Sequence, residues 1–225
     1  EDGIRDLVRF VGSEMCIRDR PVPKALSAMA LMAFVEAARE TIIIDTRAMV
    51  GFSGAHIPGA LSLPLNLVPL FAGWLVPYDV PLLLVTDGGD PMSVVRYLVR
   101  MGYDDVAGYL VGGMYAWSVA RMPIETSSLV VPQALSDNLA DAWVLDVREE
   151  DEAARGLIPG AHNIPLNQLL DRMDEIPATA DVVVYCNSGR RSMIVASVLQ
   201  RQGYTATSVL LGGIDAWRKD GLMVK

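Results

Sequence analysis

The sequence predicts an α/β protein built from two tandem domains, each a mainly parallel sheet with helices on both faces. Short apolar segments alternate with segments of helical periodicity, and the order of motifs repeats once along the chain. Strands that are apolar on both sides need cover on both sides, which is typical of parallel sheets. With 225 residues the chain can hold two domains of about 100 residues each.

The internal repeat aligns the two halves motif by motif. The paired motifs are IIIDTR and VLDVR, ending at Arg47 and Arg148, and IPGALSLPLN and IPGAHNIPLN, starting at Ile57 and Ile158. Both pairs are 101 residues apart, and a later GG-x-x-AW pair, ending at Trp117 and Trp217, is 100 apart. Prolines and a Thr-Ser-Ser run within 122–133 suit a linker. We therefore expect domains at 21–125 and 126–225, with 1–20 belonging to neither.

The second domain gives the clearest element pattern. Residues 142–147 and 182–185 are short apolar runs that predict buried strands. Between 193 and 203 the apolar residues at 194, 195, 198 and 199 share one helical face, and Gly203 suits the helix end. TSVLLGG, from Thr207, predicts a further strand. Parallel sheets of this kind bind ligands at the carboxyl ends of their strands.

Cys186 lies at such a strand end, in the stretch VVVYCNSGRRS at 182–192. A loop that runs from a strand into a helix directs backbone N–H groups and the helix dipole at one point, which favours a bound anion. Gly189 lets the backbone curl, while Arg190 and Arg191 add positive charge. A buried structural cysteine is the alternative, but it would not need this glycine and two arginines.

The ordered motifs D-x-R, I-P-G-A, C-N-S-G-R-R-S, G-Y and G-G-x-x-A-W resemble the rhodanese family of sulfurtransferases. The resemblance covers nearly all of the second domain and, less completely, the first. It implies that Cys186 accepts a sulfane sulfur from thiosulfate or a low-molecular-weight persulfide, becomes a persulfide and passes the sulfur to a thiophilic acceptor. It also implies no cofactor in this chain and a substrate-binding loop with Arg191 facing an anionic donor. That loop comprises Asn187, Ser188, Gly189, Arg190, Arg191 and Ser192.

Two other functions are open to such a chain. Cysteine phosphatases and arsenate reductases of related fold resemble it, but the phosphatase signature has five residues between cysteine and arginine. Here position 192 is Ser192 and the arginine comes one residue earlier, at Arg191. A pair of non-catalytic binding or scaffold domains is the second alternative, and the intact loop around Cys186 argues against it.

The first domain departs from the pattern at the loop. Its segment LLLVTDGGDPMS, 82–93, has no cysteine and no arginine. Aligning the strands puts Asp87 opposite Cys186, whereas a gapless alignment puts Val85 there. We expect a degenerate copy that serves packing or docking. Its proline-broken apolar stretch from Leu67 to Leu84 should pack on the second domain or on a domain upstream, with Phe71, Trp74 and Tyr78 as anchors.

Several other conspicuous residues have structural interpretations. The D-x-R motifs recur although only one copy holds a nucleophile, so we expect ion pairs that maintain the fold. The matched tryptophans are expected in the core. His56 and His162 occupy different repeat positions, so no zinc site is expected. The residues of the D-x-R motifs are Asp45, Arg47, Asp146 and Arg148.

Charge and composition limit the partners. A net charge of −8 argues against nucleic acid and anionic membranes, and prolines interrupt the long apolar run at 61–85. Small sulfur-containing anions or persulfides are the expected partners. Only two cysteines are present, which favours a cytoplasmic location. The stretch 66–85 resembles the degenerate rhodanese domain of bacterial persulfide-oxidising fusions, which implies an upstream metallo-β-lactamase-fold domain. GSEMCIRDR resembles translated sequencing adapter, so Cys16 is assigned no function.

Overall fold

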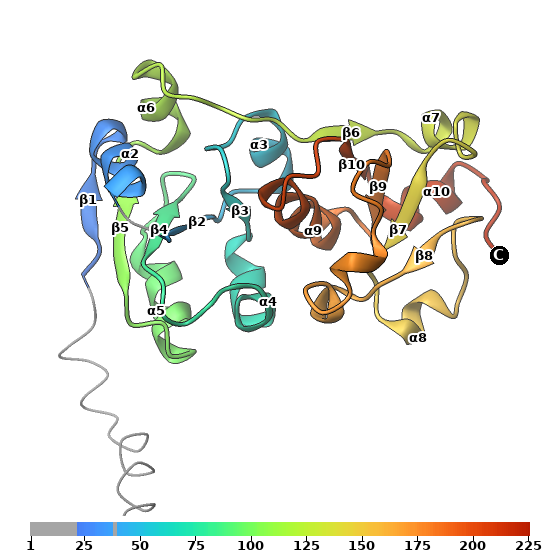
Figure 1. Cartoon of the computed structure of the whole chain (residues 1–225), viewed down its shortest axis with the longest axis horizontal. Helices are drawn as coiled ribbons and strands as arrows, with labels where there is room; N and C mark the ends of the chain where they lie inside the picture. Colours follow the sequence, from blue (N-terminus) through green and yellow to red (C-terminus); the bar gives the residue numbers. More distant parts are fainter. Residues whose placement is uncertain (1–21, 38–39) are drawn as a thin grey trace, which may run out of the picture.

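The computed structural model describes residues 22–37 and 40–225; the predicted N-terminal segment and Cys16 lie outside these ranges. Two five-stranded sheets stand side by side, one in each half of the chain (Figure 1). The first has the order β1-β5-β4-β2-β3 and the second β6-β10-β9-β7-β8. Neighbouring strands pair in parallel in both sheets. The predicted tandem α/β class is confirmed.

The first copy follows a β-α alternation throughout. Its strands are β1 (Lys24–Leu26), β2 (Ile42–Asp45), β3 (Leu61–Ser62), β4 (Leu82–Val85) and β5 (Val106–Leu110). Its helices are α2 (Ala28–Ala37), α3 (Met49–Gly54), η2 (Leu65–Leu67), α4 (Val68–Leu75), α5 (Met92–Arg100) and α6 (Gly113–Val119). Every residue of β2 and β4 is buried, as expected for strands covered on both faces.

The second copy repeats this arrangement with shorter helices before β9. Its strands are β6 (Ser128–Val130), β7 (Trp143–Asp146), β8 (His162–Asn163), β9 (Val182–Tyr185) and β10 (Thr207–Leu210). Its helices are α7 (Pro132–Asp137), α8 (Glu150–Ala153), η3 (Leu166–Gln168), η4 (Met173–Glu175), α9 (Arg190–Arg201) and α10 (Gly213–Lys219). An extended segment connects α6 to β6 across one edge of the molecule (Figure 1).

Helix α9, which follows the candidate nucleophile, lies between the two sheets (Figure 1). Its residues from Ser192 to Leu199 are all buried, because one face packs on β9 and β10 and another on β3 and α3 of the first copy. The Ser62 N–H donates to the hydroxyl of Ser197 at 2.9 Å across this contact. Two clusters of buried apolar residues draw their members from both copies, so the two domains are packed together.

The repeated ion pairs and tryptophans are confirmed as parts of the fold. Arg47 binds Asp45 with an Nη2–Oδ2 distance of 2.7 Å, and Arg148 binds Asp146 with 2.6 Å. Each arginine also donates to a backbone carbonyl eight residues later, which fixes the loop after the strand. The indole N–H groups of the two buried tryptophans donate to backbone carbonyls six residues later. These tryptophans are Trp117 and Trp217.

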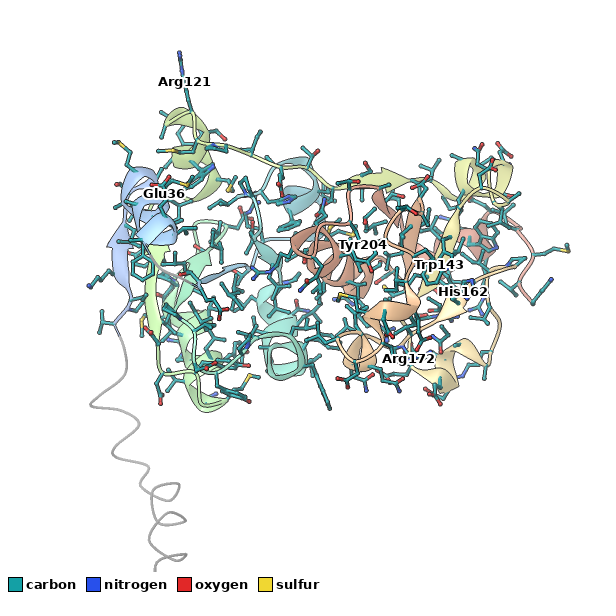
Figure 2. All side chains as sticks on the ribbon, viewed as in Figure 1. Glu36, Arg121, Trp143, His162, Arg172 and Tyr204 are labelled. Atoms are coloured by element: carbon teal, nitrogen blue, oxygen red, sulfur yellow. The ribbon has the colours of Figure 1, made fainter. Side chains whose placement is uncertain are left out.

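The two histidines lie apart, one buried and one exposed. His56 is buried and stacks on Phe52, with Nδ1 2.9 Å from the Phe52 carbonyl oxygen. His162 stacks on Trp143 in the second copy, where the two rings lie beside each other (Figure 2). Within 22–37 and 40–225, no helix is long and apolar enough to cross a membrane.

Candidate active site

Cys186 directly follows strand β9 and is the first residue of the loop that precedes α9. The Cys186 side chain is buried but reaches a cavity at the carboxyl ends of the strands. The Gly189 N–H donates to the sulfur at 3.2 Å, and the Ser192 hydroxyl lies 3.6 Å from it. The Ser192 hydroxyl also donates to the Gly189 carbonyl at 2.8 Å, so the Gly189 N–H is the clearer donor to the sulfur.

Helix α10 gives this loop its orientation. The N–H groups of Ile214 and Asp215 donate to the carbonyls of Cys186 and Asn187, at 2.9 and 3.1 Å. These carbonyls are thereby held toward α10, and the other side of the loop is left to N–H donors. Gly213 makes the close approach possible, because a Cβ there would collide with the Cys186 carbonyl oxygen and lie 2.5 Å from that of Asn187. Gly189 has φ +97°, which favours glycine.

Glu152 of α8 holds the loop from its other side. Its carboxylate receives two hydrogen bonds from the Arg191 guanidinium, at 2.6 and 2.8 Å, and one from the Asn187 amide at 2.5 Å. The Arg191 hydrogen bonds, helped by the Glu149 N–H and Asn187, lower the pKa of Glu152 to about 2 against the effect of burial. The pair also raises the pKa of Arg191. This residue was absent from the sequence-based prediction of the site.

The two loop arginines have different environments. Arg191 lines the cavity, but its charge is balanced by Glu152 at contact distance. Arg190 is exposed, and its guanidinium makes no hydrogen bond or ion pair with any described residue. Sequence reasoning pointed Arg191 at the donor, whereas the cation that remains uncompensated at the cavity is Arg190.

The cavity beside the thiol has a volume of about 290 Å³ and draws its walls from both copies. The second copy contributes the loop and the first contributes η2 and α4. The lining residues are Leu67, Leu70, Phe71, Cys186, Asn187, Ser188, Arg190 and Arg191. The expectation that the apolar stretch after Leu67 packs on the second domain is thus confirmed for Phe71, while Trp74 and Tyr78 are more than half exposed.

The first copy has a different residue where the nucleophile would be. Asp45 pairs with Val85 and Asp146 with Tyr185 in the two sheets, so the next residue, Thr86, is the counterpart of Cys186. Both sequence alignments, to Asp87 and to Val85, were therefore wrong by one residue. The error arises because the repeat spacing changes from 101 to 100 between these strands. On any of these alignments, the loop of the first copy has no cysteine and no arginine.

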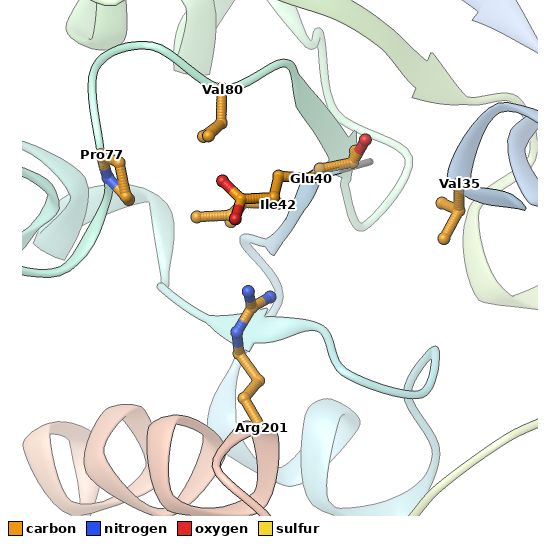
Figure 3. A pocket seen from close by; sticks show the side chains of 7 residues that line it. Val35, Glu40, Ile42, Pro77, Val80 and Arg201 are labelled. Carbon is orange, nitrogen blue, oxygen red and sulfur yellow. The ribbon is translucent and has the colours of Figure 1, made fainter. Parts of the chain in front are cut away.

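A further cavity of about 440 Å³ lies at the amino-terminal end of strand β2 in the first sheet (Figure 3). It is lined at the amino end of β2 by Glu40, Thr41 and Ile42, and Arg201 of α9 points into it from the second copy (Figure 3). Cys186 lies at the carboxyl end of its strand. This cavity is therefore separate from the candidate active site.

Comparison with known proteins identifies both halves. The Rhodanese-like domain model matches residues 28–120 and 131–220. A "Sulfurtransferase" of Allochromatium vinosum is 42% identical over 95 residues, which are 41% of this chain and 89% of that protein. "Thiosulfate sulfurtransferase 16, chloroplastic" of Arabidopsis thaliana is 31% identical over 118 residues, 47% of this chain and 96% of that protein. A crystal structure of thiosulfate sulfurtransferase from Pseudomonas aeruginosa has a TM-score of 0.41 and 26% identity, covering 91% of this chain and 43% of that one.

Proposed function

Both halves of this chain belong to the rhodanese-like family, whose relatives support a sulfurtransferase role, and on that premise we propose that the second copy transfers a sulfane sulfur through a persulfide on Cys186. The observation that carries the proposal is the environment of the thiol. Its sulfur accepts the Gly189 N–H at 3.2 Å and lines a cavity that Arg190 and Arg191 line as well. The donor is thiosulfate or a low-molecular-weight persulfide, and the acceptor is a thiophile.

The first half-reaction is a nucleophilic displacement. The Cys186 thiolate attacks the outer sulfur of thiosulfate, a bond forms between the two sulfurs, and the S–S bond of thiosulfate breaks. Sulfite leaves with the electron pair, and Cys186 carries a persulfide. An acceptor such as cyanide then attacks the terminal sulfur and restores the thiolate, with no net oxidation and no cofactor from this chain.

The loop stabilises the charge that moves in these steps. The terminal sulfur of a persulfide carries negative charge, and preorganised N–H donors around such an atom cost no reorganisation during the reaction. The Gly189 N–H and the Ser192 hydroxyl already lie against the nucleophilic sulfur. Arg190 supplies a cation for the leaving sulfite, and the Glu152–Arg191 pair keeps the loop in shape without adding net charge.

The direct test is to incubate the protein with thiosulfate and weigh it intact. We expect a gain of one sulfur atom, its removal by cyanide and the release of thiocyanate. Cys186→Ser should take up no sulfur, whereas Cys16→Ser should behave as the parent chain. Sulfur uptake or turnover that survives in Cys186→Ser would overturn the mechanism, and a parent chain that takes up no sulfur from any donor would favour the scaffold function.

A further inference from the structure

We propose that a second cavity, formed almost entirely by the degenerate first copy, binds the organic part of a persulfide donor that carries a carboxylate. Arg190 would bind that carboxylate at the junction of the two cavities. The inference rests on the proposed sulfur transfer and names the substrate class for the same site. It assigns the first copy a role in substrate binding.

The second cavity adjoins the first at Arg190. Its volume is about 540 Å³, and it lies at the carboxyl ends of β2 and β3. Its lining residues are Thr46, Ala48, Met49, Val50, Pro64, Leu65, Asn66, Tyr97 and Arg190. Leu65 in this cavity and Leu67 beside the thiol are the two ends of the same helical turn, η2. A ligand whose sulfur lies at Cys186 can therefore extend past Arg190 into the space above the first sheet.

The chemistry of the walls fits a molecule larger than thiosulfate. Leu67, Leu70 and Phe71 form an apolar wall beside the thiol, which a small dianion cannot use because burying charge against hydrocarbon is costly. An organic chain gains free energy from the same surface. The lining of the second cavity adds three residues with polar side chains, Thr46, Asn66 and Tyr97, and ligand sites commonly use a few polar groups to fix the orientation.

The charge of the second cavity selects an anion. Arg190 is the one charged residue among those that line it, and no carboxylate is among them. The charge of Arg191 is already paired with the carboxylate of Glu152, which accepts two of its hydrogen bonds, so Arg190 is the better partner for a second anion. A planar guanidinium binds a carboxylate through paired hydrogen bonds. The donor expected from these features is an aliphatic or peptidic persulfide with at least one carboxylate.

The reaction with such a donor balances in the same way as that with thiosulfate. The Cys186 thiolate attacks the outer sulfur of R–S–SH, forms Cys186–S–SH and releases R–S⁻ with the electron pair of the broken S–S bond. The organic thiolate leaves through the second cavity. Its carboxylate on Arg190 keeps the outer sulfur directed at the nucleophile.

Two persulfides, one with carboxylates and one without, test the proposal. The kcat/KM of glutathione persulfide, which has two carboxylates, is compared with that of the persulfide of 2-mercaptoethanol, which has none. Val50→Glu puts a carboxylate into the second cavity at a side chain that is 65% exposed, so the fold should tolerate it. We expect the ratio of the two constants to fall by about 2- to 5-fold, the size expected for one near-surface charge interaction. Arg190→Gln should lower the ratio in the same direction.

Val119→Glu is the matched control. Val119 is also a valine of the first copy, is also 65% exposed and lies on α6 away from both cavities. It should leave the ratio unchanged. Equal falls for the two persulfides, no fall for either, or an equal fall in Val119→Glu would each overturn the proposal. Sulfur uptake by the parent chain from thiosulfate but from neither persulfide would also overturn it and leave the proposed function standing, whereas no uptake from any donor would refute the proposed function itself.

Discussion

The two copies keep one arginine–carboxylate pair in common and differ in another. Asp45–Arg47 and Asp146–Arg148 have nearly the same geometry, and each arginine also binds a carbonyl eight residues later. The pair between Arg191 and Glu152 has no counterpart in the first copy. By the spacing of the matched strands and loops, Pro91 and Gly51 stand there instead. A pair kept in both copies maintains the fold, and a pair found only beside the thiol maintains the loop.

The loops themselves differ in charge and in backbone. Where the second copy has Cys186 and Arg190, the first has Thr86 and Asp90. Helix α9 begins at Arg190, but α5 begins at Met92, two residues later by the same spacing. The Thr86 hydroxyl donates to the Gly89 carbonyl at 3.3 Å, within its own loop. The first copy has thus lost the whole sulfur-binding loop, while its η2 and α4 form a wall of the remaining site.

The largest effect is expected from an attempt to restore the lost site. Thr86→Cys in a Cys186→Ser background puts a thiol at the matched position, but without arginines and next to two aspartates. We expect thiosulfate:cyanide turnover to stay at least about 10³-fold below that of the parent chain, as low as when the nucleophile is removed, because the new thiol lacks the loop that stabilises a thiolate. Thiocyanate release measures it. Turnover near the parent level would mean that the thiol alone distinguishes the copies.

A second large effect is expected at the glycine beneath the loop. Gly213→Ala drives a Cβ into the carbonyls of Cys186 and Asn187, so turnover should fall by about 100-fold and stability by about 2 to 4 kcal/mol. Urea unfolding and thiocyanate release measure the two quantities.

Two matched glycines sharpen this result. In Gly113→Ala the new Cβ would lie 2.9 Å from the Thr86 carbonyl oxygen in the first copy. This variant should therefore lose stability, while its activity per folded molecule stays unchanged. Gly221→Ala has a similar positive φ but open space around it, and should cost only about 1 kcal/mol. Equal losses of activity in all three variants would show that the loop contact has no special role.

Removal of the Glu152 carboxylate should give a moderate effect. Glu152→Gln replaces the two carboxylate oxygens that accept from Arg191 and Asn187 with one neutral amide oxygen, so kcat should fall by about 10-fold as the loop loses its fixed shape. The KM for thiosulfate should not rise, because a negative charge has been taken from the neighbourhood of an anion. A rise in KM with an unchanged kcat would contradict a positioning role. Glu149→Gln, on the same helix end, is a control for helix capping alone.

The sequence was informative where the pattern is local. Buried strands, the loop position of Cys186 and the repeated Asp146–Arg148 pair followed from periodicity and repetition. The role of Glu152 was not predicted, because its contact with Arg191 spans 39 residues of sequence and no local pattern indicates it. A signal was nevertheless present, since EEDE in the second copy aligns with AMVG in the first, and Glu152 is lost together with Arg191. The cavity walls from the first copy depend on how two domains pack, which neither motif spacing nor composition determines.

The smallest expected effect is a difference between the copies in how the free energy of unfolding depends on pH. The folded pKa of Glu152 is about 2, below its ordinary value of 4.5, so the pair stabilises the protein fully above about pH 4.5 and loses that contribution as the pH falls through 2. The contribution is at most about 3 kcal/mol and smaller where solvent reaches the pair. Urea unfolding of the parent chain and Glu152→Gln should differ by a constant amount from pH 8 to pH 5, and the gap should close toward pH 2. Gly51→Gln at the matched position of the first copy should show no such closing gap. A gap that stays constant down to pH 2 would mean that the carboxylate acts by packing, and that its ionised form does not distinguish the two loops.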